Sequence, residues 1–313
     1  MIVTLATHTK HVSFHRIFKI ITGWCSTRDT DVLNMYRHAI HISSIKLHHE
    51  LSRMRMNYNE VLDASYAGAK VINLSWTSGC EFNIYQQMAM DEVYENGSFI
   101  VAAAGNGSTC GGPDSLVYPA AYNNVFSVTS IGEFDNHERV AGDPHSTHQH
   151  NSNIDLCAPG YEVWISPSQN WETTGSGTSF ACPFVTGTVA LMRAINPCLS
   201  NDDISYILKV TSVNVDALNL DYAGLIGEGR LNAAAAVEMA AGFNAITLTT
   251  NHSLSCGTYG GQIEVGVIGG NAPYTYEWSN GSSDSNLMDI AAGEYTVTVT
   301  DATGCSSDTT ITL

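Results

Sequence analysis

A serine that could act as a nucleophile stands in the segment GTSFACPFVTG, residues 177–187, where a turn runs into a long apolar stretch. A serine hydroxyl needs a base to take its proton, and the intermediate that it forms needs donors aimed at the developing oxyanion. The apolar stretch predicts a buried helix, and the first N–H groups of a helix have no partner within it. Ser179 is therefore a candidate nucleophile, and its own N–H is a candidate oxyanion donor.

A second oxyanion donor is expected from Asn106, which ends the segment SFIVAAAGN of residues 98–106. The apolar part of this segment predicts a buried strand. Open α/β sheets hold their ligands at the edge where the strands end. The amide of Asn106 is therefore predicted to lie at that edge and to converge with the hydroxyl of Ser179 on one substrate carbonyl.

These side chains need a sheet to hold them, and residues 57–104 alternate between helical and strand patterns. NYNEVLDASYAGA predicts a helix that closes on Gly68, and KVINLSW is an apolar, β-branched run of buried-strand length. CEFNIYQQMAMDEVYENG predicts a second helix that ends at Gly97. Four apolar residues fall at helical spacing and are expected on one face of this helix: Phe82, Tyr85, Ala89 and Val93. Strands joined through a helix lie parallel, so the predicted fold is α/β, with a parallel sheet covered by helices on both faces.

The later helices have recognisable starts and ends. Residues 178–196 are apolar nearly all round, which predicts a buried central helix with Pro183 in its first turn. Ser200 with Asp203 has the pattern of a helix start. LNAAAAVEMAAG predicts a closing helix that ends at Gly242.

The pattern changes after about residue 243. Short β-rich runs follow, separated by Gly, Asn, Ser and Asp turns: AITLTTN, GQIEVGV, APYTYEW and GEYTVTVTD. Residues 243–313 are therefore predicted to form a small separate β-sandwich domain.

Several of these segments together resemble the subtilisin-like serine proteases. Residues 177–187 match the family's serine motif G-T-S-x-A-x-P-x-V-x-G throughout. VINLSW resembles the strand that lines the substrate groove, AAAGN the strand with the oxyanion asparagine, and YPAAY the loop with a cis proline. IDLCAPG resembles the segment before the nucleophile, and GEGRLNAAAAV the closing stretch. The resemblance covers about residues 43–240, and a serine that is only a turn residue would not bring the other motifs into register.

The resemblance implies an endopeptidase that hydrolyses peptide bonds through an acyl-enzyme on Ser179. A polypeptide substrate would lie as an extended strand and pair through backbone groups. The substrate-binding residues that the resemblance implies are Leu74, Ser75, Trp76, Ala103, Ala104 and Gly105. Trp76 stands where the family has a small residue, and a place in the core is an equal alternative for its side chain.

The remaining members of the family's triad are poorly matched. By resemblance the general base is His8, in HTKHVSF, where both glycines of the family's motif are replaced, and His11 competes for the role. The family's aspartate belongs upstream of the histidine, whereas Asp29 and Asp31 follow it. We therefore expect a peptidase that is impaired because its catalytic aspartate is absent. The alternative is a non-catalytic remnant that acts as a cell-surface or adhesive binding protein.

Charge is unevenly spread along the chain. The formal net charge of −17 argues against nucleic acid or an anionic membrane as a partner. Residues 1–55 hold eight of the thirteen Lys and Arg and carry +5, whereas the remainder carries −22. This change predicts a divergent or aberrant segment over residues 1–42, with an ordinary basic surface as the alternative, and leaves residues 43–242 as an incomplete peptidase domain. No apolar run approaches the about 18 residues that a membrane helix needs.

The tail from Cys256 to Cys305 resembles a SprB-type repeat of bacterial surface proteins. That likeness implies a secreted protein with cell-surface or matrix contact through residues 243–313, and a disulfide between these two cysteines. Cys80 and Cys110 are expected to be close enough to form another, with two free thiols as the alternative. Two further cysteines flank the nucleophile and are expected to be small buried residues: Cys157 and Cys182.

Metal and cofactor sites are not indicated by the sequence. His145, His148 and His150 have a spacing that a metal could use, but a solvated loop is the expected state of this segment. Structural calcium is common in the family, yet no loop here has a recognisable set of calcium ligands. No cofactor is expected for catalysis.

Overall fold

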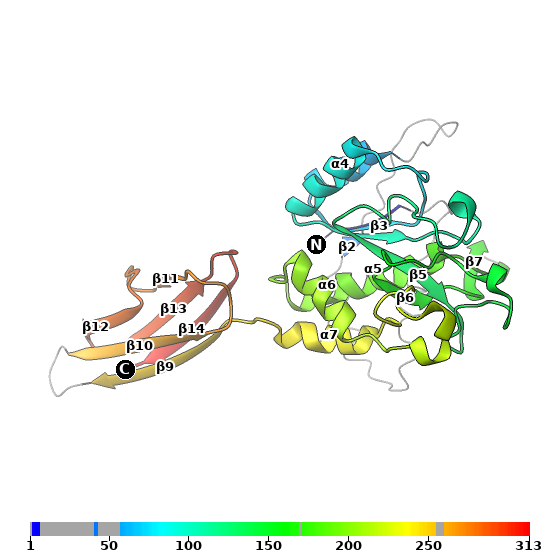
Figure 1. Cartoon of the computed structure of the whole chain (residues 1–313). Helices are drawn as coiled ribbons and strands as arrows, with labels where there is room; N and C mark the ends of the chain where they lie inside the picture. The colour runs from blue at the N-terminus through cyan, green and yellow to red at the C-terminus, as the bar shows by residue number, and fades with distance from the viewer. Residues whose placement is uncertain (1, 7–40, 43–56, 169–170, 255–259) are drawn as a thin grey trace. The chain divides into compact units, whose positions relative to one another are not determined.

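The computed structural model describes residues 2–6, 41–42, 57–168, 171–254 and 260–313 (Figure 1). It divides into two compact units. The first comprises Met1–Ile195 with Ser200–Ala240, and the second comprises Asn196–Leu199 with Ala241–Leu313. The two units are described separately below.

A parallel sheet forms the centre of the first unit, as predicted. Its six strands are in the order β2-β1-β3-β4-β5-β6, and each neighbouring pair is parallel. Every residue of β4 and β5 is buried, which explains their continuous apolar sequences. The strands span Ile2–Ala6, His41–Ile42, Ala69–Leu74, Phe99–Ala103, Val125–Ile131 and Leu156–Pro159.

Helices pack on this sheet where the sequence predicts them. In Figure 1 α4 lies on one side of the strands, and α5, α6 and α7 lie on the other. The chain between the helices and strands contains short 3-10 turns and an antiparallel hairpin of β7 (Val163–Ser168) and β8 (Trp171–Gly175). The helices α3 to α7 span Tyr58–Tyr66, Ile84–Glu95, Thr178–Ile195, Asn201–Val210 and Ala233–Gly242.

The helix ends follow from local side-chain chemistry. The Asn57 side chain accepts the backbone N–H groups that open α3, and Asn83 does the same for α4. Ser200 and Asp203 form the capping box predicted for α6. Gly97 follows α4 with φ +81°, a left-handed conformation that suits glycine at a helix end.

The predicted apolar face of α4 is only half right. Ala89 and Val93 are buried against the sheet, but Phe82 lies before the helix begins, and Phe82 and Tyr85 are 56% and 79% exposed. Met90 and Gln87 take the buried positions instead. Spacing alone could not identify this face, because the helix carries apolar residues on several sides.

The central helix α5 contacts four strands of the sheet, β3 to β6. It contains Pro183 in its second turn, one turn later than predicted. With 18 residues and a mean hydropathy of 1.3, α5 is long and apolar enough to cross a membrane. This differs from the sequence prediction, in which no apolar run reaches that length. However, 56% of this helix is buried within the described part of the chain, as in the core helix of a globular domain.

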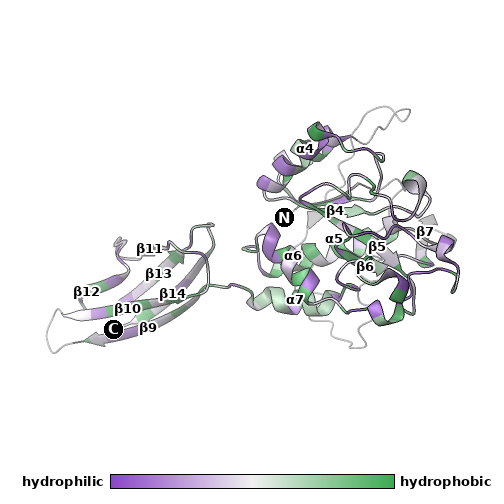
Figure 2. Cartoon of the chain, viewed as in Figure 1, coloured by the Kyte–Doolittle hydropathy of each residue, from purple (hydrophilic) through white to green (hydrophobic). Residues whose placement is uncertain are grey.

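The second unit consists of two antiparallel three-stranded sheets, with orders β12-β10-β9 and β11-β13-β14. Hydrophobic and hydrophilic residues alternate along the strands (Figure 2). One apolar cluster joins side chains of both sheets: Ile263, Val265, Trp278, Leu287, Val297, Val299 and Ile311. The strands β9 to β14 span Thr247–Leu254, Gly261–Ile268, Thr275–Trp278, Asn286–Ile290, Glu294–Thr300 and Ser306–Thr312.

One of the two predicted disulfides is wrong. Cys80 and Cys110 are bonded as expected. Cys305, however, is bonded to Cys198, whereas its predicted partner Cys256 lies outside the described residues. The segment Asn196–Leu199 packs with the second unit, so a cysteine 107 residues away along the chain reaches Cys305. The prediction failed because it sought a partner only within the repeat itself.

Candidate active site

Ser179 is the second residue of α5 and lies against the end of β3. Two hydrogen bonds connect it to Ser75, which directly follows that strand. The Ser75 hydroxyl donates to the Ser179 carbonyl at 3.0 Å, and the Ser179 hydroxyl donates to the Ser75 carbonyl at 3.2 Å. The start of the helix is thereby fixed to the C-terminal edge of the sheet.

Pro183 explains why the Ser179 carbonyl needs a donor from outside the helix. In a regular α-helix this carbonyl would accept the N–H of residue 183, and proline has none. The Ser75 hydroxyl supplies the missing donor. An isolated helix with this sequence would lack this donor for the Ser179 carbonyl.

A buried polar chain holds Ser75 in turn. The Asn73 side-chain Nδ2 donates to the Ser75 hydroxyl at 2.8 Å, and the Asn73 Oδ1 accepts from the Thr186 hydroxyl at 2.9 Å. Asn73 and Thr186 are fully buried, so water does not compete for these bonds. Sequence reasoning missed Asn73, although an asparagine inside an apolar strand is a signal that its amide has a specific partner.

Asn106 contacts Thr178, the residue before Ser179, so the two predicted side chains lie near each other as expected. Its Oδ1 accepts the backbone N–H of Thr178 at 2.9 Å and the Thr178 hydroxyl at 3.1 Å. The N–H of Gly105 donates to the same hydroxyl at 3.1 Å. The amide oxygen of Asn106 is thus occupied, and no described residue accepts a hydrogen bond from its Nδ2. This arrangement leaves the Nδ2 group available as a donor at the start of α5.

The residues predicted to bind substrate lie at the ends of two adjacent strands. Leu74 ends β3 and pairs with Ala102 of β4, so the two segments reach the same edge of the sheet. Five of these residues are wholly or partly buried: Leu74, Ala103, Ala104 and Gly105 are buried, and Ser75 is half-buried. Trp76 is half-buried and packs edge-on against Tyr58, 5.5 Å away, beside the apolar cluster under α3. The structure therefore favours the core alternative for the Trp76 side chain.

The predicted base and the acidic residues considered with it lie outside the described part of the chain: His8, His11, Asp29 and Asp31. Strand β1 ends at Ala6, two positions before His8. Their roles remain predictions.

Neither of the free thiols Cys157 and Cys182 is activated. Cys157 and Cys182 are buried and unbonded, as predicted. The Cys182 Sγ donates to the carbonyl of Val101 at 3.3 Å, and burial raises the pKa of this thiol to about 12. Burial likewise raises the pKa of the Cys157 thiol. Both act as small packing residues at neutral pH.

The histidine segment is not a solvated loop, contrary to the prediction. His145 is exposed, but His148 and His150 are buried, and their rings pack at a tilt against those of Tyr161 and Tyr222. The His150 Nδ1 lies 3.0 Å from the Nε2 of His137. Periodicity could not reveal this burial, because residues 147–150, which follow a short 3-10 helix over Pro144–Ser146, lie in neither a helix nor a strand. Among the described residues no group of three His, Cys, Asp or Glu could hold a metal ion.

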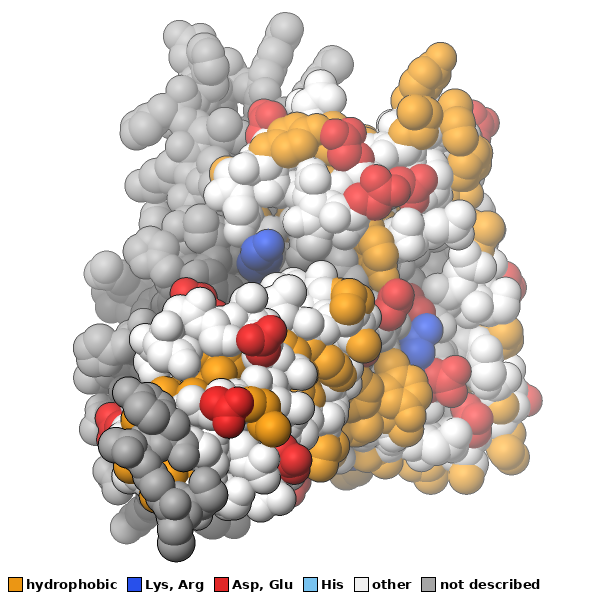
Figure 3. All heavy atoms as spheres, turned by 90° about the vertical axis from the view of Figure 1, so that its left-hand side faces the viewer, with side chains coloured by type: hydrophobic (Ala, Val, Ile, Leu, Met, Phe, Trp, Pro, Cys, Tyr) orange, Lys and Arg blue, Asp and Glu red, His pale blue; other side chains and the backbone are white. Residues whose placement is uncertain are grey.

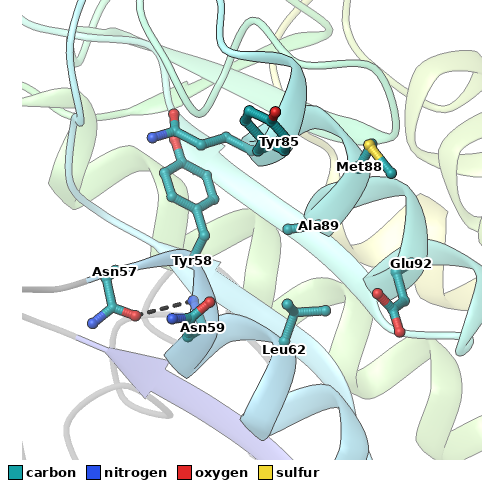
Figure 4. Close-up of a pocket in the computed structure, with 9 residues that line it drawn as sticks. Asn57, Tyr58, Asn59, Leu62, Tyr85, Met88, Ala89 and Glu92 are labelled. Carbon is teal, nitrogen blue, oxygen red and sulfur yellow. Dashed lines mark hydrogen bonds between the residues drawn. The ribbon is translucent and has the colours of Figure 1, made fainter.

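A pocket of about 400 Å³ lies between α3 and α4 (Figure 4). It shares none of its lining with the residues around Ser179. The side chains of Tyr85 and Met88 on α4 face those of Tyr58 and Leu62 on α3 across it. Because Ser179 and Asn106 lie together and neither lines this pocket, we place the candidate active site around Ser179 and not in the pocket.

A parallel α/β sheet that brings a helix-borne serine beside an asparagine amide is the arrangement of the subtilisin-like proteins. The model of the Subtilase family matches residues 25–234, more than half of the chain. The chain therefore belongs to the subtilase family, whose members are serine endopeptidases.

Relatives support this assignment. The chain is 32% identical over 175 residues to Subtilisin DY of Bacillus licheniformis, an alignment that covers 56% of this chain and 59% of that protein. It is 32% identical over 180 residues to Thermitase of Thermoactinomyces vulgaris, covering 58% of each. The chain thus spans less than two thirds of the length of these relatives.

The fold also matches solved structures. The prenylagaramide maturation protease PagA aligns with a TM-score of 0.56 over 76% of this chain and 92% of that chain, at 18% identity. A lanthipeptide protease aligns with a TM-score of 0.50 at 18% identity, over 64% of this chain and 70% of that one. At such identity the likeness shows the fold alone.

Proposed function

We propose that this chain is a serine endopeptidase that cleaves polypeptides through an acyl-enzyme on Ser179. The observation that carries the proposal is the pair of hydrogen bonds from Thr178 to Asn106 Oδ1, which sets the Asn106 amide beside the start of α5. A donor fixed before the reaction stabilises a developing oxyanion without the cost of reorganising at that moment.

In the proposed reaction the Ser179 Oγ attacks the carbonyl carbon of a peptide bond, and the carbonyl oxygen becomes an oxyanion. The Asn106 Nδ2 and the Ser179 N–H donate to that oxygen. The base, His8 in this proposal, takes the Ser179 proton and gives it to the departing amine. Water then hydrolyses the ester and restores the hydroxyl. Before the attack, the Ser179 hydroxyl must exchange its bond to the Ser75 carbonyl for one to the base.

Substrate is proposed to lie between the segments 74–76 and 103–105 as an extended strand. Among the described side chains on the face shown in Figure 3, acidic groups are prominent and Lys and Arg are sparse. This charge disfavours a nucleic acid partner. The two disulfides agree with a secreted protein, because such bonds persist in oxidising compartments.

A fluorophosphonate probe, which labels activated serines, tests the proposal. We expect the unmodified chain and the control Ser176→Ala to label equally, and Ser179→Ala to remain unlabelled. Asn106→Ala should label about 10²–10³ times more slowly, the loss that removal of the equivalent donor causes in subtilisin. Equal labelling of Ser179→Ala and the unmodified chain would refute the proposal. The sequence leads us to expect an impaired activity, and the absolute rate of labelling of the unmodified chain measures the extent of that impairment.

A second proposed role is surface attachment through residues 243–313. This segment has its own apolar core, belongs to a separate compact unit, and contains no Lys or Arg. Binding of the full Ser179→Ala chain to bacterial envelope and matrix fractions would test it without proteolysis of those fractions. This role would be contradicted if the chain bound to none of these fractions.

A further inference from the structure

We infer that Gln149 is a positioning residue for the Asn106 amide, because it holds the loop that carries Asn106. The inference rests on the proposed function of Asn106 as an oxyanion donor. The loop is residues 105–112, which follow β4. Gln149 comes from a different part of the chain, the segment between β5 and β6, and is fully buried.

Every polar atom of the Gln149 side chain bonds to the backbone of this loop. Its Oε1 accepts the N–H of Gly107 at 2.7 Å. Its Nε2 donates to the carbonyls of Thr109 at 2.9 Å and Gly112 at 2.8 Å. The backbone N–H of Gln149 donates to the Gly105 carbonyl at 3.2 Å. Gln149 thus holds the loop on both sides of Asn106, before it through its backbone N–H and after it through its side chain.

The loop approaches Gln149 so closely that only glycine fits at its two nearest positions. A Cβ on Gly105, where φ is +119°, would lie 2.9 Å from the Gln149 Oε1. A Cβ on Gly107, where φ is +76°, would lie 2.3 Å from the carbonyl oxygen of Thr147. Asn106 is therefore the one residue with a side chain between two glycines, and its backbone path is set by contact with residues 147–149.

The side-chain bonds of Asn106 alone do not fix the loop. Thr178 holds its Oδ1 from the side of α5. The backbone N–H of Asn106 donates to the Thr109 hydroxyl at 3.3 Å, within the same loop. Gln149 anchors the loop from the segment between β5 and β6, in addition to the Cys80–Cys110 disulfide, so that the Asn106 amide is held both by α5 and by an anchored loop.

The chemistry of the site requires a glutamine. Three bonds from one side chain need one acceptor and two donors in an amide plane. Glutamate has the same shape but would present an oxygen to the carbonyls of Thr109 and Gly112. Gln149→Glu is therefore the discriminating variant, because it preserves volume and removes the donors.

A matched control exists in Gln87, which is also buried and also bonds a loop backbone. Its Oε1 accepts the N–H of Asn123 at 3.0 Å, and its Nε2 donates to the Asn123 carbonyl at 3.2 Å. Asn123 precedes β5, at the edge of the sheet opposite to Asn106. Gln87→Glu thus disturbs a similar clamp that does not reach the candidate active site.

The experiment compares fluorophosphonate labelling of Gln149→Glu and Gln87→Glu, each alone and combined with Asn106→Ala. We expect Gln149→Glu to slow labelling about 10-fold or more alone, but less than about 2-fold when Asn106 is already alanine, because coupled residues are not additive. Gln87→Glu should change neither rate. Equal losses from Gln149→Glu in both backgrounds would overturn the inference.

Hydrogen exchange of residues 105–112 gives a readout that does not depend on activity. Gln149→Glu should accelerate exchange of this loop relative to Gln87→Glu, and unchanged exchange would overturn the inference. If the unmodified chain shows no Ser179-dependent labelling, the proposed function fails, and the exchange result still decides whether Gln149 holds the loop. If Gln149→Glu does not fold, Gln149→Leu removes the same bonds without adding charge and takes its place.

Discussion

Replacing Ser75 with alanine should weaken the first unit through two groups at once. The Ser179 carbonyl loses the side-chain donor that replaces the N–H absent from Pro183, and the fully buried Asn73 Nδ2 loses its acceptor. Removing one partner of a buried hydrogen bond costs about 1–3 kcal/mol. Water can reach the half-buried Ser179 but not Asn73, so we expect the free energy of unfolding to fall by about 2–4 kcal/mol.

Pro183→Ala should rescue part of this loss. Alanine restores the backbone N–H at position 183, which can then bond the Ser179 carbonyl within the helix. The Asn73 amide gains nothing from this change. We therefore expect Ser75→Ala to cost about 1 kcal/mol less in the Pro183→Ala background, close to the net value of one hydrogen bond.

Urea unfolding followed by circular dichroism at 222 nm measures this coupling, because the long helices belong to the first unit. Thr188→Ala is the matched control, since its hydroxyl donates to the carbonyl of Phe184 on the same helix and does not touch Ser179. It should show no coupling to Pro183→Ala. An equal cost of Ser75→Ala in both backgrounds would refute the reasoning that Ser75 substitutes for the N–H lost at Pro183.

Two further predictions concern other parts of the chain. Burial first, and the charge of a neighbouring histidine second, lower the pKa of His137 to about 4. Its contribution to stability is therefore complete above pH 6.5 and is lost as the pH falls toward 4, by about 3 kcal/mol. His137→Gln should flatten urea-unfolding stability between pH 7 and 4, whereas the exposed His145→Gln should not, and identical slopes would contradict this. In the second unit Asp301 accepts the N–H groups of Asn271, Thr303 and Cys305, so Asp301→Ala should lower the stability of that unit by about 2–4 kcal/mol in calorimetry, and an unchanged transition would contradict this.

Sequence reasoning succeeded where a local rule determines the structure. The strands around Val101, the capping box at Ser200 and the glycine after α4 each follow from residues within one turn or strand. The proximity of Asn106 and Ser179 followed from topology, because parallel strands and the helix after them end at one edge.

It failed where distant segments decide burial. The disulfide of Cys198 with Cys305 and the buried state of His148 depend on packing between segments that share no periodic pattern. Gln149 was missed for the same reason, since its partners lie about 40 residues away in a loop. A glutamine in a polar segment gives no sign in the sequence that it is fully buried.

These failures and successes distinguish two sets of residues in the candidate active site, those proposed to touch substrate and those that hold them in place. The groups proposed to touch substrate, Ser179 and Asn106, occur in recognisable motifs because their chemistry requires a particular residue type. The groups that fix them, Asn73 and Gln149, are buried amides that use both their nitrogen and their oxygen in hydrogen bonds to other residues. Other side chains can supply equivalent hydrogen bonds if the surrounding packing also changes, so residues in this role need not belong to a motif. The accuracy with which the oxyanion donor is placed therefore depends on residues that motif comparison does not detect, and substitutions at these positions should reduce catalysis while both motifs remain intact.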